Sequence, residues 1–179
     1  MSGTITVQNI QGPTTGSNAN KVLVPSGHKL HAPGHIVQVS AFTQVNDLQI
    51  IINNSSSNTA ITQVTSTITP ERAGSKFLVN FHTQLYAPSG QYFAIMIFKS
   101  VNGGSYVGTT GKPHAYPGNV GAWQDCEISL IDTPTYTLGQ SISYRPYVYT
   151  YNTSGNAYFG WGSSGGGSAT TMFTMEIAQ

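Results

Sequence analysis

The alternation of side chains between residues 77 and 85 limits, more than any other feature, what this chain can fold into. One face of this segment would carry Phe77, Val79, Phe81, Thr83 and Leu85, and the other Leu78, Asn80, His82 and Gln84. A period of two residues is that of a β-strand, whose successive side chains point to opposite faces. No segment shows the sustained i, i+3, i+4, i+7 apolar stripe of an amphipathic helix, and Gly or Pro interrupts nearly every stretch. We therefore predict an all-β protein.

Segments rich in β-branched and aromatic residues recur along the chain at the spacing of a two-sheet sandwich. Strands are expected at 36–43, 48–52, 61–69, 77–85, 91–99, 124–131, 140–151, 157–161 and 170–177. Clusters of Pro, Gly and Asn predict turns at 70–74, 88–90 and 102–104, the last of a hairpin type. The Gly-rich segment 162–167 is interpreted as a loop within one fold, because it joins two predicted strands.

The first 35 residues differ from the rest of the chain. Residues 14–20 form a polar stretch, and only the short apolar run at 22–24 suggests a strand. We interpret residues 1–35 as an N-terminal arm or anchor and residues 36–179 as the sandwich domain. Cys126 is the single cysteine, so no disulfide within the chain can support either part. The first residues lack the basic and apolar regions of a signal peptide, which counts against a secreted protein.

Charged residues are scarce. Asp, Glu, Lys and Arg make up 7% of the chain, against a usual share of about 25%, and the formal net charge is +1. Nucleic-acid binding needs clustered Lys and Arg, whereas the seven basic residues here are scattered, so we expect no nucleic-acid partner. The longest apolar run, residues 93–98, is far shorter than the about 20 residues of a membrane-spanning helix, so we expect no membrane partner. Sparse charge also leaves little to oppose self-association.

Two predicted strands carry apolar or aromatic side chains on both faces. In the strand 91–99, one face carries Phe93, Ile95 and Ile97, and the other Tyr92, Ala94, Met96 and Phe98. In a sandwich one face of each strand meets the partner sheet, so the other must meet a second chain or a covering loop of the same chain. The first alternative predicts a homo-oligomer, and its interface candidates are Tyr92, Met96, Phe98, Tyr147 and Tyr149.

Residues 68–179 resemble the C1q/TNF-like jelly roll in the order and spacing of their segments. The similar segments are KFLVNF at 76–81, YFAIMIFK at 92–99, LGQ at 138–140, YFG at 158–160 and ATTMFTMEI at 169–177. The resemblance implies a jelly-roll β-sandwich that forms a homotrimer about an aromatic-lined threefold axis. No functional site carries over from that family, and the chain lacks its collagen-like stalk and acidic calcium loop.

The N-terminal part resembles a different group of proteins. The run GSNANKVLVPSGHKL at 16–30, followed by PGHIVQV at 33–39, is similar to the leader of tail-fibre-like and other virion structural proteins of tailed phages, including cyanophages. The segments ITP at 68–70 and GSKFLV at 74–79 fit the same group. This resemblance implies a location on the virion, with residues 1–35 docking onto another virion protein.

Two clusters of residues suggest chemistry. His28, His31 and His35 would either meet at a threefold axis and bind a metal there, or lie in a solvated loop. We favour the loop and expect no cofactor, because no carboxylate or cysteine lies nearby to complete a metal site.

Asp125 and Glu127 would share a strand face, as the paired carboxylates of a glycoside hydrolase do, but a solvated strand face is the simpler interpretation. Cys126, between them, would point inward as a small core residue. No nucleophile, P-loop or dinucleotide motif appears, so we expect no enzymatic activity.

Exposed aromatic residues are the candidates for ligand contact. Tyr106, Tyr116, Trp123 and Trp161 lie in or near predicted loops, where they would either stack on sugar rings or pack within a trimer. We predict a virion structural protein, a trimeric jelly roll that serves as a capsid decoration or as a short fibre component contacting a host-surface glycan. The alternatives from other classes are a glycan-degrading virion enzyme and a secreted C1q-like binding module.

Overall fold

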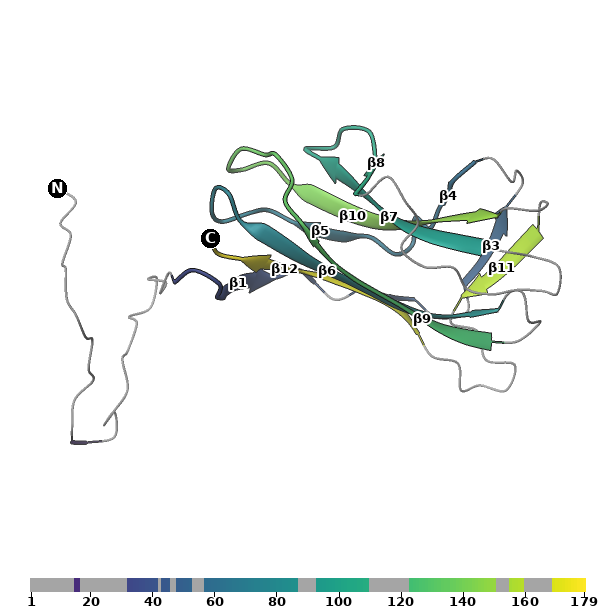
Figure 1. The fold of residues 1–179 in the computed structure, drawn as a ribbon, viewed down its shortest axis with the longest axis horizontal. Coiled ribbons are helices and arrows are strands. Elements are labelled where there is room, and N and C mark those ends of the chain that lie inside the picture. Colours follow the sequence, from purple (N-terminus) through teal and green to yellow (C-terminus); the bar gives the residue numbers. More distant parts are fainter. Residues whose placement is uncertain are drawn as a thin grey trace. The chain divides into compact units, whose positions relative to one another are not determined.

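The structure is a computed structural model, and it describes residues 15–16, 32–41, 43–45, 48–52, 57–86, 93–109, 123–150, 155–159 and 169–179. The chain divides into two units, residues 1–32 and 33–179. The described residues of the second unit form twelve strands and no helix, in two antiparallel sheets (Figure 1). The all-β prediction is therefore confirmed. Most of the predicted arm, residues 1–35, lies outside the described residues and stays a prediction.

Seven strands form the first sheet: β1 (Ile36–Val39), β2 (Thr43–Val45), β3 (Leu48–Ile52), β6 (Lys76–Tyr86), β9 (Trp123–Asp132), β11 (Gly155–Phe159) and β12 (Thr170–Ile177). The long strand β6 pairs with β9 along one side, and with β12 and β11 along its other side. Strand β12 in turn pairs with β1 and β2, and β11 pairs with β3. The described sheet therefore runs from β9 through β6 and β12 to β1.

Five strands form the second sheet: β4 (Thr59–Ala60), β5 (Ser66–Ile68), β7 (Phe93–Val101), β8 (Val107–Gly108) and β10 (Ile142–Thr150). Strand β10 pairs with β7 on one side and with β4 and β5 on the other, and β7 pairs with β8. Along the chain, β5, β6, β7, then β8, β9, β10, β11 alternate between the two sheets. Among the described strands of the second sheet, only β7 and β8 are both consecutive in the chain and paired with each other. The predicted turn joins them, and in it Asn102 and Gly103 have positive φ angles of 52° and 72°.

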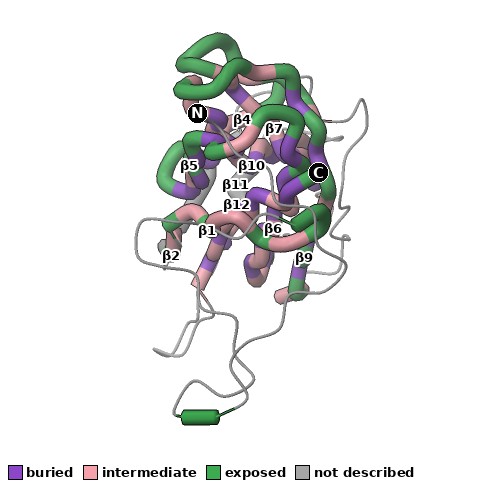
Figure 2. The backbone as a smooth tube through the Cα atoms, turned by 90° about the vertical axis from the view of Figure 1, so that its left-hand side faces the viewer, coloured by how far each residue is buried: buried purple, intermediate pink, exposed green. Residues whose placement is uncertain are grey.

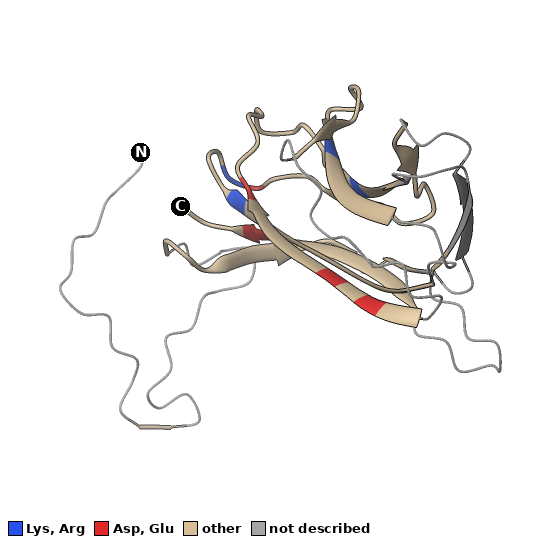
Figure 3. Cartoon of the chain, turned by 45° about the vertical axis from the view of Figure 1, so that its right-hand side comes forward, with Lys and Arg blue, Asp and Glu red and all other residues tan. Residues whose placement is uncertain are grey.

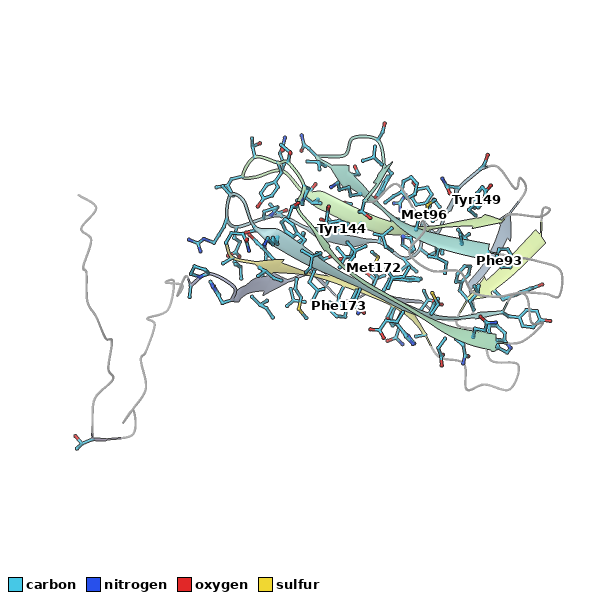
Figure 4. All side chains as sticks on the ribbon, in the orientation of Figure 1. Phe93, Met96, Tyr144, Tyr149, Met172 and Phe173 are labelled. Carbon is cyan, nitrogen blue, oxygen red and sulfur yellow. The ribbon has the colours of Figure 1, made fainter. Side chains whose placement is uncertain are left out.

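The core lies between the two sheets, where the long strands β6, β10 and β12 bury alternate side chains (Figure 2). The inner face of β6 carries Phe77, Val79, Phe81, Thr83 and Leu85, all fully buried, as the alternation predicts. The second sheet contributes Phe93, Ile95, Ile97, Ile142, Tyr144 and Val148 to the same core. Figure 4 shows Phe93, Tyr144 and Met172 between the sheets. Because burying one such side chain stabilises a fold by about 1.5–3 kcal/mol, this layer holds the two sheets together.

The predicted strand 61–69 is wrong in its first half. A turn begins the segment, with Val64 N donating to Ile61 O at 3.2 Å, and only Ser66–Ile68 forms a strand. Burial explains the difference, because Ile61 and Val64 are both fully buried in the core. A strand would point two residues three positions apart to opposite faces, whereas the turn directs both inward.

The predicted strand 36–43 is interrupted after Val39. Here Thr174 N, on the neighbouring strand β12, donates to the hydroxyl of Ser40 at 2.8 Å instead of to a backbone carbonyl. The same hydroxyl lies 2.7 Å from Ser66 Oγ, which in turn lies 2.8 Å from Thr174 Oγ1. These three linked hydroxyl groups take the place of one backbone hydrogen bond between β1 and β12, and they connect both strands to β5 of the opposite sheet.

A buried carboxylate joins the sheets at the end of β9. The two oxygens of Asp132 accept hydrogen bonds from Lys99 Nζ at 2.8 and 3.0 Å, and Oδ2 accepts another from the Tyr144 hydroxyl at 2.9 Å. Burial and the nearby carboxylate raise the pKa of Tyr144 far above its ordinary value, so the hydroxyl remains a donor. Because Lys99 and Tyr144 belong to the second sheet and Asp132 to the first, this cluster connects the two layers.

A second buried carboxylate holds the turn between β5 and β6. Glu176 accepts hydrogen bonds from Gln38 Nε2 at 2.7 Å, from Ser75 Oγ at 2.7 Å, and from the backbone N–H groups of Glu71 and Arg72 at 3.0–3.2 Å. Burial alone would raise the pKa of Glu176, but these hydrogen bonds lower it below its ordinary value of 4.5. The carboxylate therefore stays ionised inside the fold and fixes the turn to β12.

We predict that Glu176→Gln destabilises the fold by about 2 kcal/mol at pH 7, because an amide brings its own N–H groups against the donors that surround this site. The folded-state pKa of Glu176 lies below the ordinary value of 4.5, so its contribution is present above about pH 4.5 and disappears as the pH falls further. Urea unfolding at pH 7 and at about pH 3 measures both effects.

The matched control is Glu127→Gln, the same substitution at an exposed position of β9. It should change the free energy of unfolding by less than about 0.5 kcal/mol at either pH. Equal losses for the two variants, or a loss for Glu176→Gln that does not shrink at low pH, would contradict the assigned role.

Candidate interaction surfaces

The outer face of the second sheet carries the described residues that the sequence predicts as an interface. Strand register places Met96 opposite Tyr147, Phe98 opposite Arg145 and Ala94 opposite Tyr149 on this face. Figure 4 shows Met96 and Tyr149 on the side of the sheet away from Met172 and the core. Met96, Phe98, Tyr147 and Tyr149 are half-buried, and Tyr92 lies outside the described residues.

An aromatic cluster with one cation covers part of this face. The rings of Phe98 and Tyr147 stack with centroids 4.2 Å apart, and the Tyr106 ring lies 6.1 Å from that of Tyr147. The Arg145 guanidinium lies over the Tyr106 ring, with Cζ 4.4 Å from the ring centroid, and Arg145 Nε donates to Thr65 Oγ1 at 2.9 Å. The loop between β7 and β8, which carries Tyr106, therefore covers part of the face of its own chain.

The outer face of the first sheet is also apolar. Register aligns Val39, Met175, Leu78 and Ile131 in one row across β1, β12, β6 and β9. Ile36 and Ile177 pair beside this row. We call these six residues the apolar patch. Charged residues are sparse on both sheets (Figure 3).

The patch contains most of the strongly exposed apolar surface that the structure describes. Ile36, Val39 and Ile131 are 51%, 52% and 54% exposed. Among the described residues, the other large hydrophobic side chains that are strongly exposed are Val107 and Leu138. Scattered exposed hydrophobic residues are ordinary, whereas a contiguous apolar group on a sheet face is a candidate interaction surface.

Strand β12 turns its more apolar face outward. Phe173, Met175 and Ile177 point away from the core, as Figure 4 shows for Phe173, while Thr170, Met172, Thr174 and Glu176 point inward and are buried. Inside, Glu176 and Thr174 have the partners described above, and Thr170 Oγ1 lies 2.7 Å from Thr83 Oγ1. Because polar residues occupy the core side with their hydrogen bonds satisfied, core packing does not account for the outer row.

The opposite end of the same face carries aromatic residues. The Tyr86 ring lies 5.3 Å from the ring of Trp123 and 6.0 Å from that of Tyr158, measured between centroids. Trp123, a predicted ligand contact, begins β9 and is half-buried against this cluster. Tyr116 and Trp161, the other predicted contacts besides Tyr106, lie outside the described residues.

The predicted chemical groups occupy the middle of this face. Asp125 and Glu127 share the outer side of β9 and are exposed, and Glu127 Oε1 accepts a hydrogen bond from Asn80 Nδ2 at 3.2 Å. Register sets His82 opposite Glu127. Cys126 points inward and is buried, as predicted.

The predicted histidine cluster is described only in part. His28 and His31 lie outside the described residues, whereas the His35 carbonyl accepts a hydrogen bond from Ala178 N at 3.0 Å. Among the residues that the structure describes, no three His, Cys, Asp or Glu side chains are grouped so as to hold a metal ion. No helix in the same part of the chain is long and apolar enough to cross a membrane.

Sequence reasoning missed Arg145 and the apolar patch. The patch had a signal, since Met175 and Ile177 alternate with polar residues in the same way as residues 77–85. No sequence signal indicated the Arg145 cluster, because Phe98, Tyr106 and Arg145 lie in three separate segments of the chain. No protein-family model and no curated protein sequence matches this chain.

We predict that Cys126 in the folded chain reacts with iodoacetamide at least about 100-fold more slowly than in the unfolded chain. Burial excludes the reagent and raises the pKa of the Cys126 thiol to about 11, so roughly one thiol in a thousand is ionised at pH 8. Mass spectrometry of timed samples, with and without guanidinium chloride, measures both rates. Similar rates in the two conditions would show an accessible, ionised thiol.

Proposed function

We propose that this chain is a structural protein of a tailed-phage virion, which forms a homotrimer of jelly-roll domains and docks through its N-terminal arm. In this role it decorates the capsid or forms part of a short fibre, and it has no catalytic activity. The observation that carries the proposal is the outward-facing apolar row of β12 and its neighbours, which a single sandwich leaves half exposed.

The order of the strands supports the jelly-roll assignment. Eight strands in chain order, β1, β5, β6, β7, β8, β9, β10 and β12, give the sheet orders β1-β12-β6-β9 and β5-β10-β7-β8. First and last strands are neighbours, and most successive strands lie in opposite sheets. A chain that wraps between two sheets in this way has the arrangement of a jelly roll.

The apolar patch supports self-association, and it favours the first sheet as the contact face. Burial of exposed apolar area against another surface is favourable by roughly 25 cal/mol per Å². The chain has few charges to prevent such contact between copies. The interface candidates on the second sheet, Met96, Phe98, Tyr147 and Tyr149, are less exposed and partly covered by Tyr106.

The virion location rests on the resemblance of residues 16–39 to phage structural proteins, and on a physical point about the arm. Gly34 N donates to Ala178 O at 2.8 Å, and Ala178 N to His35 O, so the last residues of the proposed arm pair with the C-terminal end of the sandwich. An arm that precedes an assembled trimer would give three attachment points to another virion protein, and multivalent attachment strengthens weak contacts.

We predict that the chain sediments at micromolar concentration as a trimer of three 19.0 kDa subunits, about 57 kDa, and that Ile131→Glu sediments as a monomer. Burying an unpaired carboxylate in an apolar contact costs several kcal/mol, which would weaken assembly by at least about 100-fold. Analytical ultracentrifugation over a range of concentrations measures this.

The matched control is Leu138→Glu, since Leu138 is exposed to a similar degree, 57% against 54%, but lies in a turn outside the patch. It should sediment like the unaltered chain. A monomeric unaltered chain would refute self-association. Dissociation by Met96→Glu but not by Ile131→Glu would move the interface to the second sheet.

We further predict that the chain remains with purified phage particles, and that deletion of residues 1–31 abolishes binding to particles lacking the protein without dissociating the trimer. The deletion keeps Gly34 and His35, which pair with Ala178, so the sandwich retains its first contacts. Cryo-electron microscopy of the decorated particles would distinguish capsid from tail. Absence of the chain from purified particles, or full binding by the shortened chain, would contradict the proposal.

A further inference from the structure

Arg145 is held in place, and it has no acidic partner in the part of the chain that the structure describes. Its Nε donates to Thr65 Oγ1, and Thr65 Oγ1 itself donates to Thr62 O at 3.2 Å, so the guanidinium is supported from one side. The Tyr106 ring lies against its face. Among the described residues no carboxylate pairs with Arg145, although five of the six acidic residues in the chain are described. A half-buried guanidinium without a carboxylate has terminal N–H groups available to an outside acceptor.

The hydroxyl groups of Tyr106 and Tyr147 are available in the same way. Tyr106 and Tyr147 are half-buried, and neither hydroxyl has a hydrogen-bond partner among the described residues. Two residues before Arg145 on β10, Ser143 Oγ lies 2.8 Å from Thr67 Oγ1 on the same outer face. Arg145 therefore shares this face with two aromatic rings and a pair of aliphatic hydroxyl groups.

We propose that Arg145, Tyr106 and Tyr147 form a binding site for a sugar that carries a carboxylate, such as a uronic acid residue of a surface polysaccharide. The guanidinium pairs with the carboxylate through its terminal nitrogens, a geometry that suits Arg better than Lys. The Tyr rings contact the apolar C–H side of the sugar ring, and the Tyr, Thr and Ser hydroxyl groups exchange hydrogen bonds with its hydroxyl groups.

The chemistry of the site favours a sugar over an acidic peptide. A peptide carboxylate would use Arg145 alone, whereas the rings and hydroxyl groups around it fit a ligand with both an apolar face and many hydroxyl groups. This binding site rests on the proposed virion role in one respect, which is the choice of a surface polysaccharide as the source of the sugar. The site lies on the second sheet, so it remains accessible when the apolar patch of the first sheet is covered.

Isothermal titration calorimetry with the full chain tests the site. The probes are tetragalacturonic acid, the same tetrasaccharide with its carboxyl groups reduced to alcohols, and a tetraglutamate peptide. We expect the unaltered chain to bind tetragalacturonic acid in preference to both other probes. Arg145→Gln should weaken this binding by at least about tenfold, and Arg145→Lys by less, since Lys keeps the charge but not the fork of donors. Tyr106→Phe should weaken it more modestly.

The matched control is Lys76→Gln, which removes one exposed positive charge from the first sheet. It should bind tetragalacturonic acid like the unaltered chain. No binding of tetragalacturonic acid, equal binding of the reduced tetrasaccharide, equal binding of tetraglutamate, or unchanged binding by Arg145→Gln would each overturn the proposal. Sedimentation of the same samples separates the two ideas. A trimer that does not bind the uronate refutes the site alone, and a monomer that binds it refutes the proposed assembly alone.

Discussion

The packing of one sheet against the other decides which face of every strand is available for anything else. Strand β6 shows this most simply, since Phe77, Val79 and Phe81 enter the core and Leu78, Asn80 and His82 are left outside. Once the inner faces are assigned, the opposite sheet cannot cover the outer faces, and the loop that carries Tyr106 covers part of one of them. Their composition then reports on partners, and an apolar outer face indicates contact with another surface.

Ionised and hydroxyl groups inside the sandwich strengthen this conclusion. Glu176 and Asp132 are buried carboxylates whose hydrogen bonds are satisfied by a turn and by the opposite sheet, respectively. Strand β12 places Glu176 and Thr174 in the core, while the more apolar Met175 and Ile177 face outward and are half-buried. The proposed homotrimer would account for this pattern, because a second copy would cover the outer face.

Local patterns in the sequence predict the all-β class, the inward direction of Cys126 and the Asn102-Gly103 turn, because each depends on residues that are near one another. The turn at 61–64 was not predictable in this way, since it depends on a core built by distant strands. The contact of Glu176 with Glu71 joins residues 105 positions apart. Arg145 and Tyr106 likewise meet only because β10 pairs with β7, whose hairpin carries Tyr106 over the sheet.

In the proposed assembly, another copy of the chain covers the outer face of the first sheet. An experimental structure of the full chain, at a concentration where it is assembled, would test this arrangement. We expect three copies about an axis, with Val39, Leu78, Ile131 and Met175 of each copy within van der Waals contact of a neighbour. A structure in which these four side chains face solvent, with a single copy or with contacts made elsewhere, would contradict it.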